Sequence, residues 1–210
     1  LTAPGPIALL NVDVGLEGVA DQFLDFKEIW EQDLSTPIAE PKTDPALLIA
    51  RYSPLWDNFT TAYHNALATA RTVVVDSMTE AWEVARLARF GRLAQVLPTH
   101  YAPLNAEING LLNAALFSTA NVIFIHREKD EYINNAKTGK LDFAGQKDFP
   151  FKSTITIKHY FDYREKAFKI DVLKCRGNSA MIGETVEEPL NTFAYLASQV
   201  YPDTEMADWM

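Results

Sequence analysis

The sequence is poor in residues that form disulfides or bind structural metals. Its only cysteine is Cys175, which excludes an intrachain disulfide and any zinc site built from several cysteines. Four histidines are present without metal-ligand spacing, at positions 64, 100, 126 and 159. We therefore expect no structural metal.

Long hydrophobic runs are also missing. No apolar segment approaches the roughly 20 residues needed to cross a bilayer, and no charged leader with a small-residue cleavage site precedes Leu1. We therefore expect a cytoplasmic protein with no membrane partner. The 210 residues are 48% hydrophobic, which is enough for a substantial core and predicts one main domain.

Charge is distributed unevenly along the chain. The formal net charge of −9 argues against a polyanionic partner. Between residues 127 and 176, however, twelve Lys or Arg face eight Asp or Glu, whereas the rest of the chain has seven against twenty. This basic segment is either a binding surface or the solvated charge of an exposed hairpin.

Three apolar segments predict neighbouring strands of a parallel sheet. Residues 72–75 form a β-branched run without polar alternation, typical of a strand buried on both faces, and Asp76 and Ser77 follow it. Residues 7–12 precede Asp13, and residues 121–125 precede His126 and Arg127. Open α/β sheets bind ligands at the carboxyl ends of their strands, so these polar residues are candidate site residues.

Helical patterns separate the predicted strands. Ser53 and Pro54 predict the cap and first position of a helix that continues to about residue 70. Ser77 and Glu80 have capping-box spacing before a helix over residues 79–90 that stops at Gly91, and another helix is expected over residues 104–118. Residues 16–53 read as irregular, with short helical pieces at 23–30 and 45–49. The alternation predicts an α/β fold with a parallel sheet.

The pattern changes in the last third of the chain. A long loop is expected from Glu128 to Lys152, and alternation over residues 153–163 and 167–173 predicts an antiparallel hairpin. Pro189 opens a last helix that continues to Val200. Residues 202–210 read as a fraying or partner-seeking tail.

This order of motifs resembles the RecA-like P-loop ATPases. It is most similar to the phage-encoded nucleotide-binding proteins of that superfamily, some of which are linked to single-strand annealing and recombination. Residues 7–15, 72–79, 121–127 and 172–177 carry the resemblance. It implies a three-layer α/β core over residues 1–186, with a mainly parallel sheet and a C-terminal antiparallel hairpin, followed by a helix and tail over 187–210. It also implies a homo-oligomer that acts in a bacterial host cell.

The resemblance assigns roles to the residues that follow the first two strands. Asp76 matches the Walker B aspartate, which holds Mg²⁺ through water, and Ser77 lies beside it at the nucleotide. Asp76 could instead cap the next helix, although Ser77 is the better cap. Asp13 matches the acid that orients the attacking water; alternatively, its carboxylate satisfies the amides of Gly15 or Gly18.

Further roles fall on residues later in the chain. His126 or Arg127 matches the polar sensor that reports the γ-phosphate, although a histidine at a strand end is often only hydrogen-bonded. Lys174 and Arg176 lie two apart on a strand and share a face. They match cations that reach a neighbouring subunit's phosphates; the alternative is an edge-strand cluster with Asp162 or Asp171.

The predicted loop over residues 128–152 has a composition that suits single-stranded DNA. Cations for phosphates alternate with aromatic rings for bases, and RecA-like proteins direct the corresponding loop at DNA. Alternatively, the acidic residues of the same segment nearly cancel the charge of the lysines, and the aromatic rings pack the hairpin against the core. The cations are Lys137, Lys140, Lys147 and Lys152; the rings belong to Tyr132, Phe143, Phe149 and Phe151.

One motif of the resembled family is missing. No G-x-x-x-x-G-K-[ST] phosphate loop exists in the sequence, and Gly139 and Lys140 do not supply one. We expect that the loop lies in a segment before Leu1 and that the full protein binds ATP and Mg²⁺ and hydrolyses ATP. The leading function is an ATPase that acts on single-stranded DNA in recombination or replication. The alternatives are a packaging or remodelling P-loop ATPase and a non-catalytic assembly module.

Overall fold

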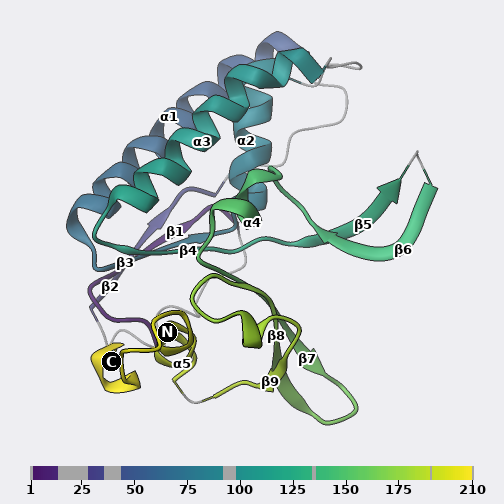
Figure 1. Cartoon of the computed structure of the whole chain (residues 1–210). Coiled ribbons are helices and arrows are strands. Elements are labelled where there is room, and N and C mark those ends of the chain that lie inside the picture. The colour runs from purple at the N-terminus through teal and green to yellow at the C-terminus, as the bar shows by residue number, and fades with distance from the viewer. Residues whose placement is uncertain are drawn as a thin grey trace. The chain divides into compact units, whose positions relative to one another are not determined.

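The computed structural model describes residues 2–13, 28–35, 44–91, 98–133, 136–189 and 191–209. Its contacts divide the chain into two compact units (Figure 1). The larger unit comprises residues 5–146, and the smaller unit comprises residues 147–210 together with residues 1–4. This division lies at a different place from the boundary predicted after residue 186.

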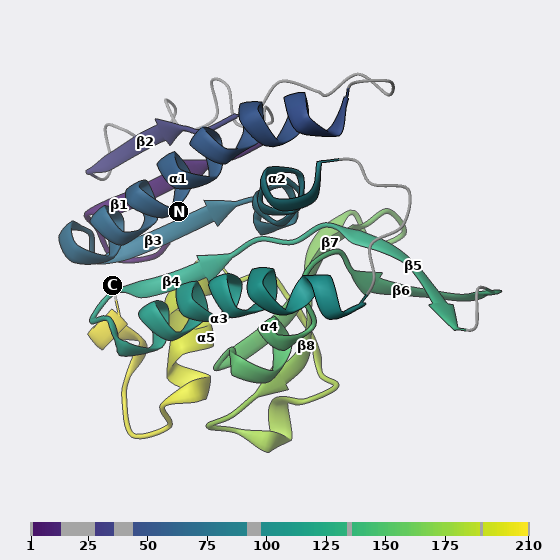
Figure 2. The ribbon, with the colours of Figure 1, turned by 90° about the horizontal axis from the view of Figure 1, so that it is seen from above.

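The larger unit contains the parallel sheet that the sequence predicts. Its strands are β1 (Ile7–Asn11), β2 (Ile29–Asp33), β3 (Thr72–Asp76) and β4 (Asn121–Phe124). They lie in the order β2-β1-β3-β4, and all neighbours are parallel (Figure 2). The α/β class is confirmed.

Strand β2 was not predicted. Residues 29–33 were expected to be irregular or helical, but they pair with β1 along its whole length. Ile29 is buried, whereas Glu31 and Asp33 are exposed, so this outer strand lacks the continuous apolar run that identifies a central one. Residues 23–27 of the predicted helical piece lie outside the described residues.

The two central strands, β1 and β3, are largely buried, and one face of them packs against a helix. All five residues of β1 are buried, as are Val73 and Val75 of β3. The register places Leu10 beside Val75 and Val75 beside Phe124, whose ring centroid lies 6.2 Å from that of Tyr63. This face of the sheet therefore packs against the helix that carries Tyr63.

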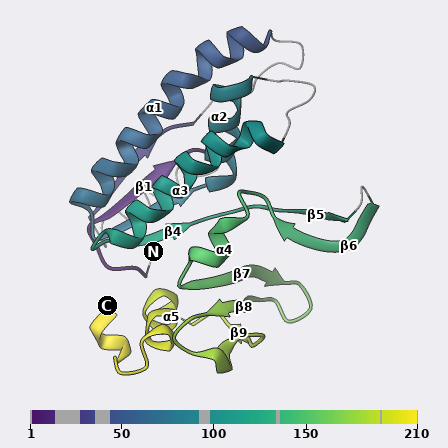
Figure 3. The same ribbon diagram turned by 45° about the horizontal axis from the view of Figure 1, so that its top comes forward.

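Three helices lie on one face of the sheet (Figures 1 and 3). They are α1 (Pro45–Thr69), α2 (Met78–Phe90) and α3 (Tyr101–Phe117); a single 3-10 turn, η3 (Pro98–His100), precedes α3. Strands β2, β3 and β4 follow one another in the same direction across the sheet, and right-handed crossovers then place their helices on the same side. Because the described helices of this unit occupy one face only, a three-layer core stays a prediction. No helix among the described residues is long and apolar enough to span a membrane.

Helix α1 begins earlier than the sequence predicts. Asp44 caps it through a 2.8 Å bond that its carboxylate accepts from the amide of Ala46, and Pro45 occupies the first position. The start predicted at Ser53 and Pro54 is therefore wrong, and Pro54 lies inside the helix. One proline removes one backbone hydrogen bond, which the buried aromatic face of this 25-residue helix outweighs.

Helix α2 has the predicted caps, Ser77 and Gly91, and begins one residue before the predicted start. The Ser77 hydroxyl accepts a 3.3 Å bond from the amide of Glu80 at the start, and Gly91 follows the last residue. Gly91 has φ +56°, and a Cβ built on it would lie 2.5 Å from the carbonyl oxygen of Pro45. Glycine here both ends α2 and allows the start of α1 to approach.

The segment predicted as one long loop is mostly regular. Strands β5 (Glu128–Ile133) and β6 (Ala136–Phe143) form an antiparallel ribbon that projects beyond β4 (Figure 2), and α4 (Asp148–Lys152) follows it. The ribbon is mostly exposed and polar, so it lacks the one-sided apolar alternation from which strands are predicted.

The smaller unit contains the predicted antiparallel hairpin. Strands β7 (Ile155–Asp162) and β8 (Ala167–Cys175) pair, and β9 (Thr185–Glu187) joins β8. A short 3-10 turn, η4 (Ser179–Met181), lies between β8 and β9. Ile170, Val172 and Cys175 form the core of this unit with Val200 of α5 (Thr192–Val200). The last helix thus begins three residues after the predicted Pro189.

The predicted tail is partly ordered. Residues Met206–Trp209 form the 3-10 turn η5. The ring of Trp209 stacks on Tyr201 at 5.3 Å, and its Nε1 donates a 2.9 Å bond to the hydroxyl of Thr204.

A pair of glycine substitutions tests the contact between α1 and α2. Gly91→Ala should lower the free energy of unfolding by about 1–3 kcal/mol, because it adds both a steric clash and a strained left-handed residue. Gly110→Ala in α3 is the control: no atom lies within 4 Å of its built Cβ, and alanine should raise helix stability by about 0.5–1 kcal/mol. Urea denaturation measures both; equal effects would contradict the close approach at Gly91.

Candidate functional site

The carboxyl ends of β1, β3 and β4 bring together three of the predicted site residues. The carbonyl oxygen of Asp76 accepts hydrogen bonds from the amides of Val12 at 2.6 Å and Asp13 at 3.2 Å. These bonds hold the residue after β1 against the last residue of β3. Arg127, just after β4, donates to the carboxylate of Asp13 and forms an ion pair with it.

A fourth member of this cluster was not predicted. Glu80 in the first turn of α2 accepts a 2.8 Å bond from Nη1 of Arg127. The neighbouring Thr79 hydroxyl accepts a 3.0 Å bond from the backbone amide of Arg127 and donates a 2.7 Å bond to the carbonyl of Ala144. The sequence signal was present, because a helix that follows a strand end places its first turn at the same edge of the sheet. We call Asp13, Asp76, Glu80 and Arg127 the edge cluster.

The edge cluster has more negative than positive charge. Asp76 is half-buried; burial raises the pKa of its carboxyl group, Asp13 raises it further, and Arg127 opposes the rise. The carboxylate of Asp13 raises the pKa of Arg127, so the guanidinium stays charged. Three carboxylates therefore share one cation, and a further cation would relieve their repulsion.

The cluster fits a cation that keeps most of its water. No group of three or more His, Cys, Asp or Glu side chains among the described residues is arranged to hold a metal directly. Mg²⁺ usually retains several waters and binds through one or two carboxylates. The half-buried Asp76 can supply one such carboxylate. Ser77, which is 1% exposed, caps α2, so Asp76 does not have the alternative role of helix cap.

His126 is placed differently from Arg127. Its ring is partly buried and meets Phe143 edge-on at 5.4 Å, and its Nδ1 lies 3.3 Å from the carbonyl oxygen of Ala144. Burial lowers the pKa of the imidazole. These contacts join β4 to the end of the β5–β6 ribbon, whereas Arg127 contacts the carboxylates.

Lys174 and Arg176 lie in the smaller unit and share a target. The ammonium of Lys174 donates to the carbonyl oxygens of Pro150, Phe151 at 2.8 Å and Ser153 at 2.7 Å. Arg176 donates a 2.6 Å bond to the carbonyl of Phe151. Both cations thus bind the carboxyl end of α4, where a positive charge is favourable. Burial, followed by the charge of Arg176, lowers the pKa of Lys174.

The alternative partners expected for these two cations are engaged elsewhere. Asp162 forms an ion pair with Lys169 at 3.2 Å. Asp171 accepts a 2.7 Å bond from the hydroxyl of Thr185 and a 3.2 Å bond from that of Tyr160. The predicted edge-strand cluster is therefore replaced by backbone carbonyls.

The four lysines predicted to contact DNA belong to different units. Lys137 and Lys140 lie on β6 in the larger unit, and Lys137 pairs with Asp130 at 2.6 Å. Lys147 precedes α4 and Lys152 ends it, both in the smaller unit.

The described aromatic side chains of the same segment have different surroundings. Phe149 is 6% exposed, and Phe143 contacts the ring of His126. Phe151 is 75% exposed. The side chain of Tyr132 lies outside the described residues.

The raised pKa of Asp76 predicts how stability depends on pH. A carboxyl group whose folded pKa exceeds its unfolded value of 3.8 binds more protons when folded, so its contribution to stability falls as pH rises through that interval. Asp76→Asn should therefore match the wild type near pH 3.5 and exceed it at pH 7, by less than about 1 kcal/mol because solvent screens the half-exposed group.

Asp33→Asn is the matched control for this pH dependence. Asp33 ends β2 at the same edge, and hydrogen bonds from Ser35 lower its pKa. Its substitution should change stability at pH 7 in the opposite direction. Urea denaturation from pH 3.5 to 7.5 measures both variants, and a loss of stability in Asp76→Asn at neutral pH would contradict the assigned charge environment.

The contacts of Lys174 predict a structural cost for its removal. Lys174→Met should lower the free energy of unfolding of the smaller unit by about 1–3 kcal/mol, because three carbonyls lose a charged donor. Arg176→Met removes one such bond and should cost less. Thermal denaturation followed by circular dichroism compares the two, and an unchanged Lys174→Met variant would leave its cation available for another role.

No protein-family model matches the sequence, and no curated protein is significantly similar to it. The sheet edge itself carries the carboxylates of Asp13 and Asp76 and the guanidinium of Arg127 at the ends of adjoining parallel strands, with the carboxylate of Glu80 from α2 beside them.

Proposed function

We propose that the edge cluster is the Mg²⁺ side of a nucleoside triphosphate hydrolysis site. In this proposal the chain is part of a RecA-like ATPase that acts on single-stranded DNA in recombination or replication. The observation that carries it is the half-buried carboxylate of Asp76 at the end of a central parallel strand, with Asp13 close to it just after the neighbouring strand β1. Ligands of open α/β sheets bind at such an edge.

The side chains have separate roles in this proposal. Asp76 would hold Mg²⁺ through water, and the ion would supply charge neutralisation for phosphate oxygens. Asp13 is the carboxylate that accepts a proton from water or orients it. Arg127 holds Asp13 and Glu80 in place, and its exposed guanidinium can exchange these partners for an anionic ligand.

The phosphate groups need a binding loop that these residues do not provide. The sequence contains no G-x-x-x-x-G-K-[ST], whose backbone amides hold phosphates. The proposal therefore assigns the loop to residues outside this sequence, and a gene that encodes such a loop ahead of Leu1 supports it. A non-catalytic assembly module is the second candidate, favoured by the same missing motif.

A single substitution tests the ATPase proposal in the full gene product. Asp76→Asn should reduce ATP turnover about 100-fold or more, because it removes the charge that holds the ion. Asp33→Asn, at the same edge of the sheet, should keep turnover close to that of the wild type. Phosphate release at saturating Mg²⁺ and ATP measures both.

Two results would argue against the proposal. Retained turnover in Asp76→Asn removes Asp76 from the site. Absence of ATP hydrolysis by the wild-type protein, with and without single-stranded DNA, favours the assembly module. Because Asp76→Asn is expected to be at least as stable as the wild type at neutral pH, unfolding would not explain a loss of activity.

A further inference from the structure

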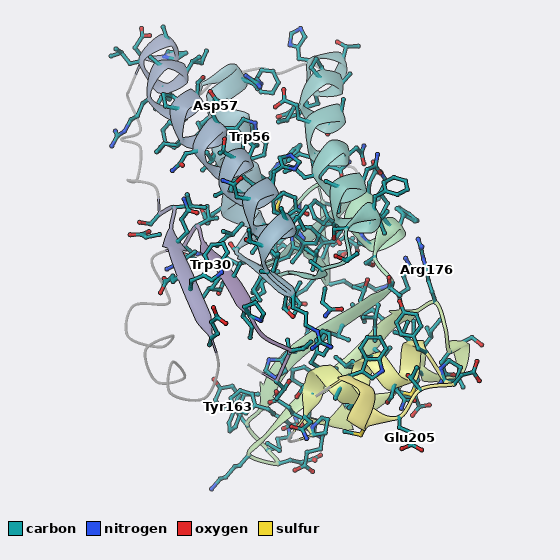
Figure 4. All side chains as sticks on the ribbon, turned by 90° about the vertical axis from the view of Figure 1, so that its left-hand side faces the viewer. Trp30, Trp56, Asp57, Tyr163, Arg176 and Glu205 are labelled. Carbon is teal, nitrogen blue, oxygen red and sulfur yellow. The ribbon has the colours of Figure 1, made fainter. Side chains whose placement is uncertain are left out.

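Four rings gather on one face of the β7–β8 hairpin, near its turn. Phe161 meets Phe168 at 5.0 Å and Tyr163 at 5.2 Å, both edge-on, and His159 stacks on Phe168 at 5.4 Å with an interplanar angle of 7°. Tyr163 is 86% exposed and Phe168 51% exposed. We call these four residues the hairpin platform; Figure 4 labels Tyr163.

The platform lies on the face of the β7–β8 sheet that, farther from the turn, packs into the core of the smaller unit. The register pairs Phe161 with Phe168, His159 with Ile170, and Ile157 with Val172, so these side chains share one face. Ile170 and Val172 are fully buried in the core of the smaller unit. The described part of that core ends at Ile170, and the rings beyond it stay in solvent. A cluster of exposed rings is not needed for the core and indicates a binding surface.

Cations and carboxylates both lie beside the platform, and the carboxylate of Glu188 is 3.1 Å from Nε2 of His159. Lys169 pairs with both acidic side chains of the turn, Asp162 at 3.2 Å and Glu165 at 2.7 Å. Asp162 also accepts hydrogen bonds from the backbone amides of residues 164 and 165. The turn cations Arg164 and Lys166 are exposed, and no carboxylate among the described residues pairs with either. The turn therefore presents two available cations next to the rings.

We propose that the hairpin platform binds single-stranded nucleic acid. Tyr163 and Phe168 supply ring faces and edges for bases, and Arg164 and Lys166 supply cations for the phosphates that connect those bases. An apolar protein partner would use the rings but would leave the two cations without ligands. The inference rests on the proposed function for the choice of DNA, and it places the contact on β7–β8 in addition to the lysines of residues 137–152.

Ring substitutions test the stacking contacts. Fluorescence anisotropy of a labelled 20-nucleotide oligo-dT at low salt should show binding by the wild-type chain. Tyr163→Ala and Phe168→Ala should each weaken it by about 5- to 100-fold, the range expected for loss of one stacked base. Phe117→Ala is the matched control, because this ring on α3 is 89% exposed and belongs to the larger unit.

Charge substitutions test the phosphate contacts. The double variant Arg164→Ala, Lys166→Asn should reduce the slope of log affinity against log salt by about 0.7 for each cation removed. Asparagine is chosen at position 166 because Lys166 has φ +54°, a conformation that asparagine tolerates. The double variant Lys137→Ala, Lys140→Ala tests the β6 cations in the same assay.

The outcomes separate this inference from the proposed function. Loss of binding in the platform variants, with ATP turnover absent, supports the platform while the ATPase fails. Loss of binding only in the Lys137, Lys140 variant overturns the platform and leaves the ATPase proposal intact. No oligo-dT binding by the wild-type chain overturns the platform, and so does self-association that Tyr163→Ala abolishes without any change in oligo-dT affinity.

Discussion

The carbonyl oxygen of Asp76 is the point on which the arrangement of the sheet edge depends. It accepts hydrogen bonds from the backbone amides of Val12 and Asp13, which follow β1, so the end of β3 determines where Asp13 lies. The parallel register aligns Asn11 with Asp76. Asp13, two residues after Asn11, therefore lies at the same edge of the sheet as Asp76. Their repulsion requires a cation, and Arg127 from β4 supplies it while also binding Glu80 of α2. The two hydrogen bonds to this carbonyl and the side chain of Arg127 thereby couple three strands and a helix.

The sequence predicts those parts of the fold that have strong local signals. Strand β3 and the caps of α2 follow from a β-branched run, from Ser77 and from Gly91. Strand β2 and the β5–β6 ribbon escaped prediction because their exposed polar side chains resemble those of loops. The start of α1 was missed because two prolines each follow a capping residue, and only the buried face of the whole helix shows that Pro45 is the first position.

The same limit applies to the candidate site. Strand ends predicted that Asp13, Asp76 and Arg127 would meet, since parallel strands share a carboxyl edge. Glu80 was seen only as a capping partner, because its contact with Arg127 spans 47 residues of sequence and depends on how α2 packs. Lys174 lies on β8 and Arg176 just beyond its end, and both donate to the carbonyl of Phe151, a backbone partner that leaves no trace in a pattern of charges.

Charge counts along the chain cannot distinguish structural cations from available ones. The basic stretch of residues 127–176 contains twelve Lys or Arg. Several of them are held within the fold: Arg127 by two carboxylates, Lys174 by carbonyls, and Lys169 by both acids of its turn. Lys169 offsets one of the two acids of its turn, so Arg164 and Lys166 leave the turn with a net charge of +1. Arg164 and Lys166 lie beside exposed aromatic rings, where a ligand that combines phosphates with flat bases can use both features.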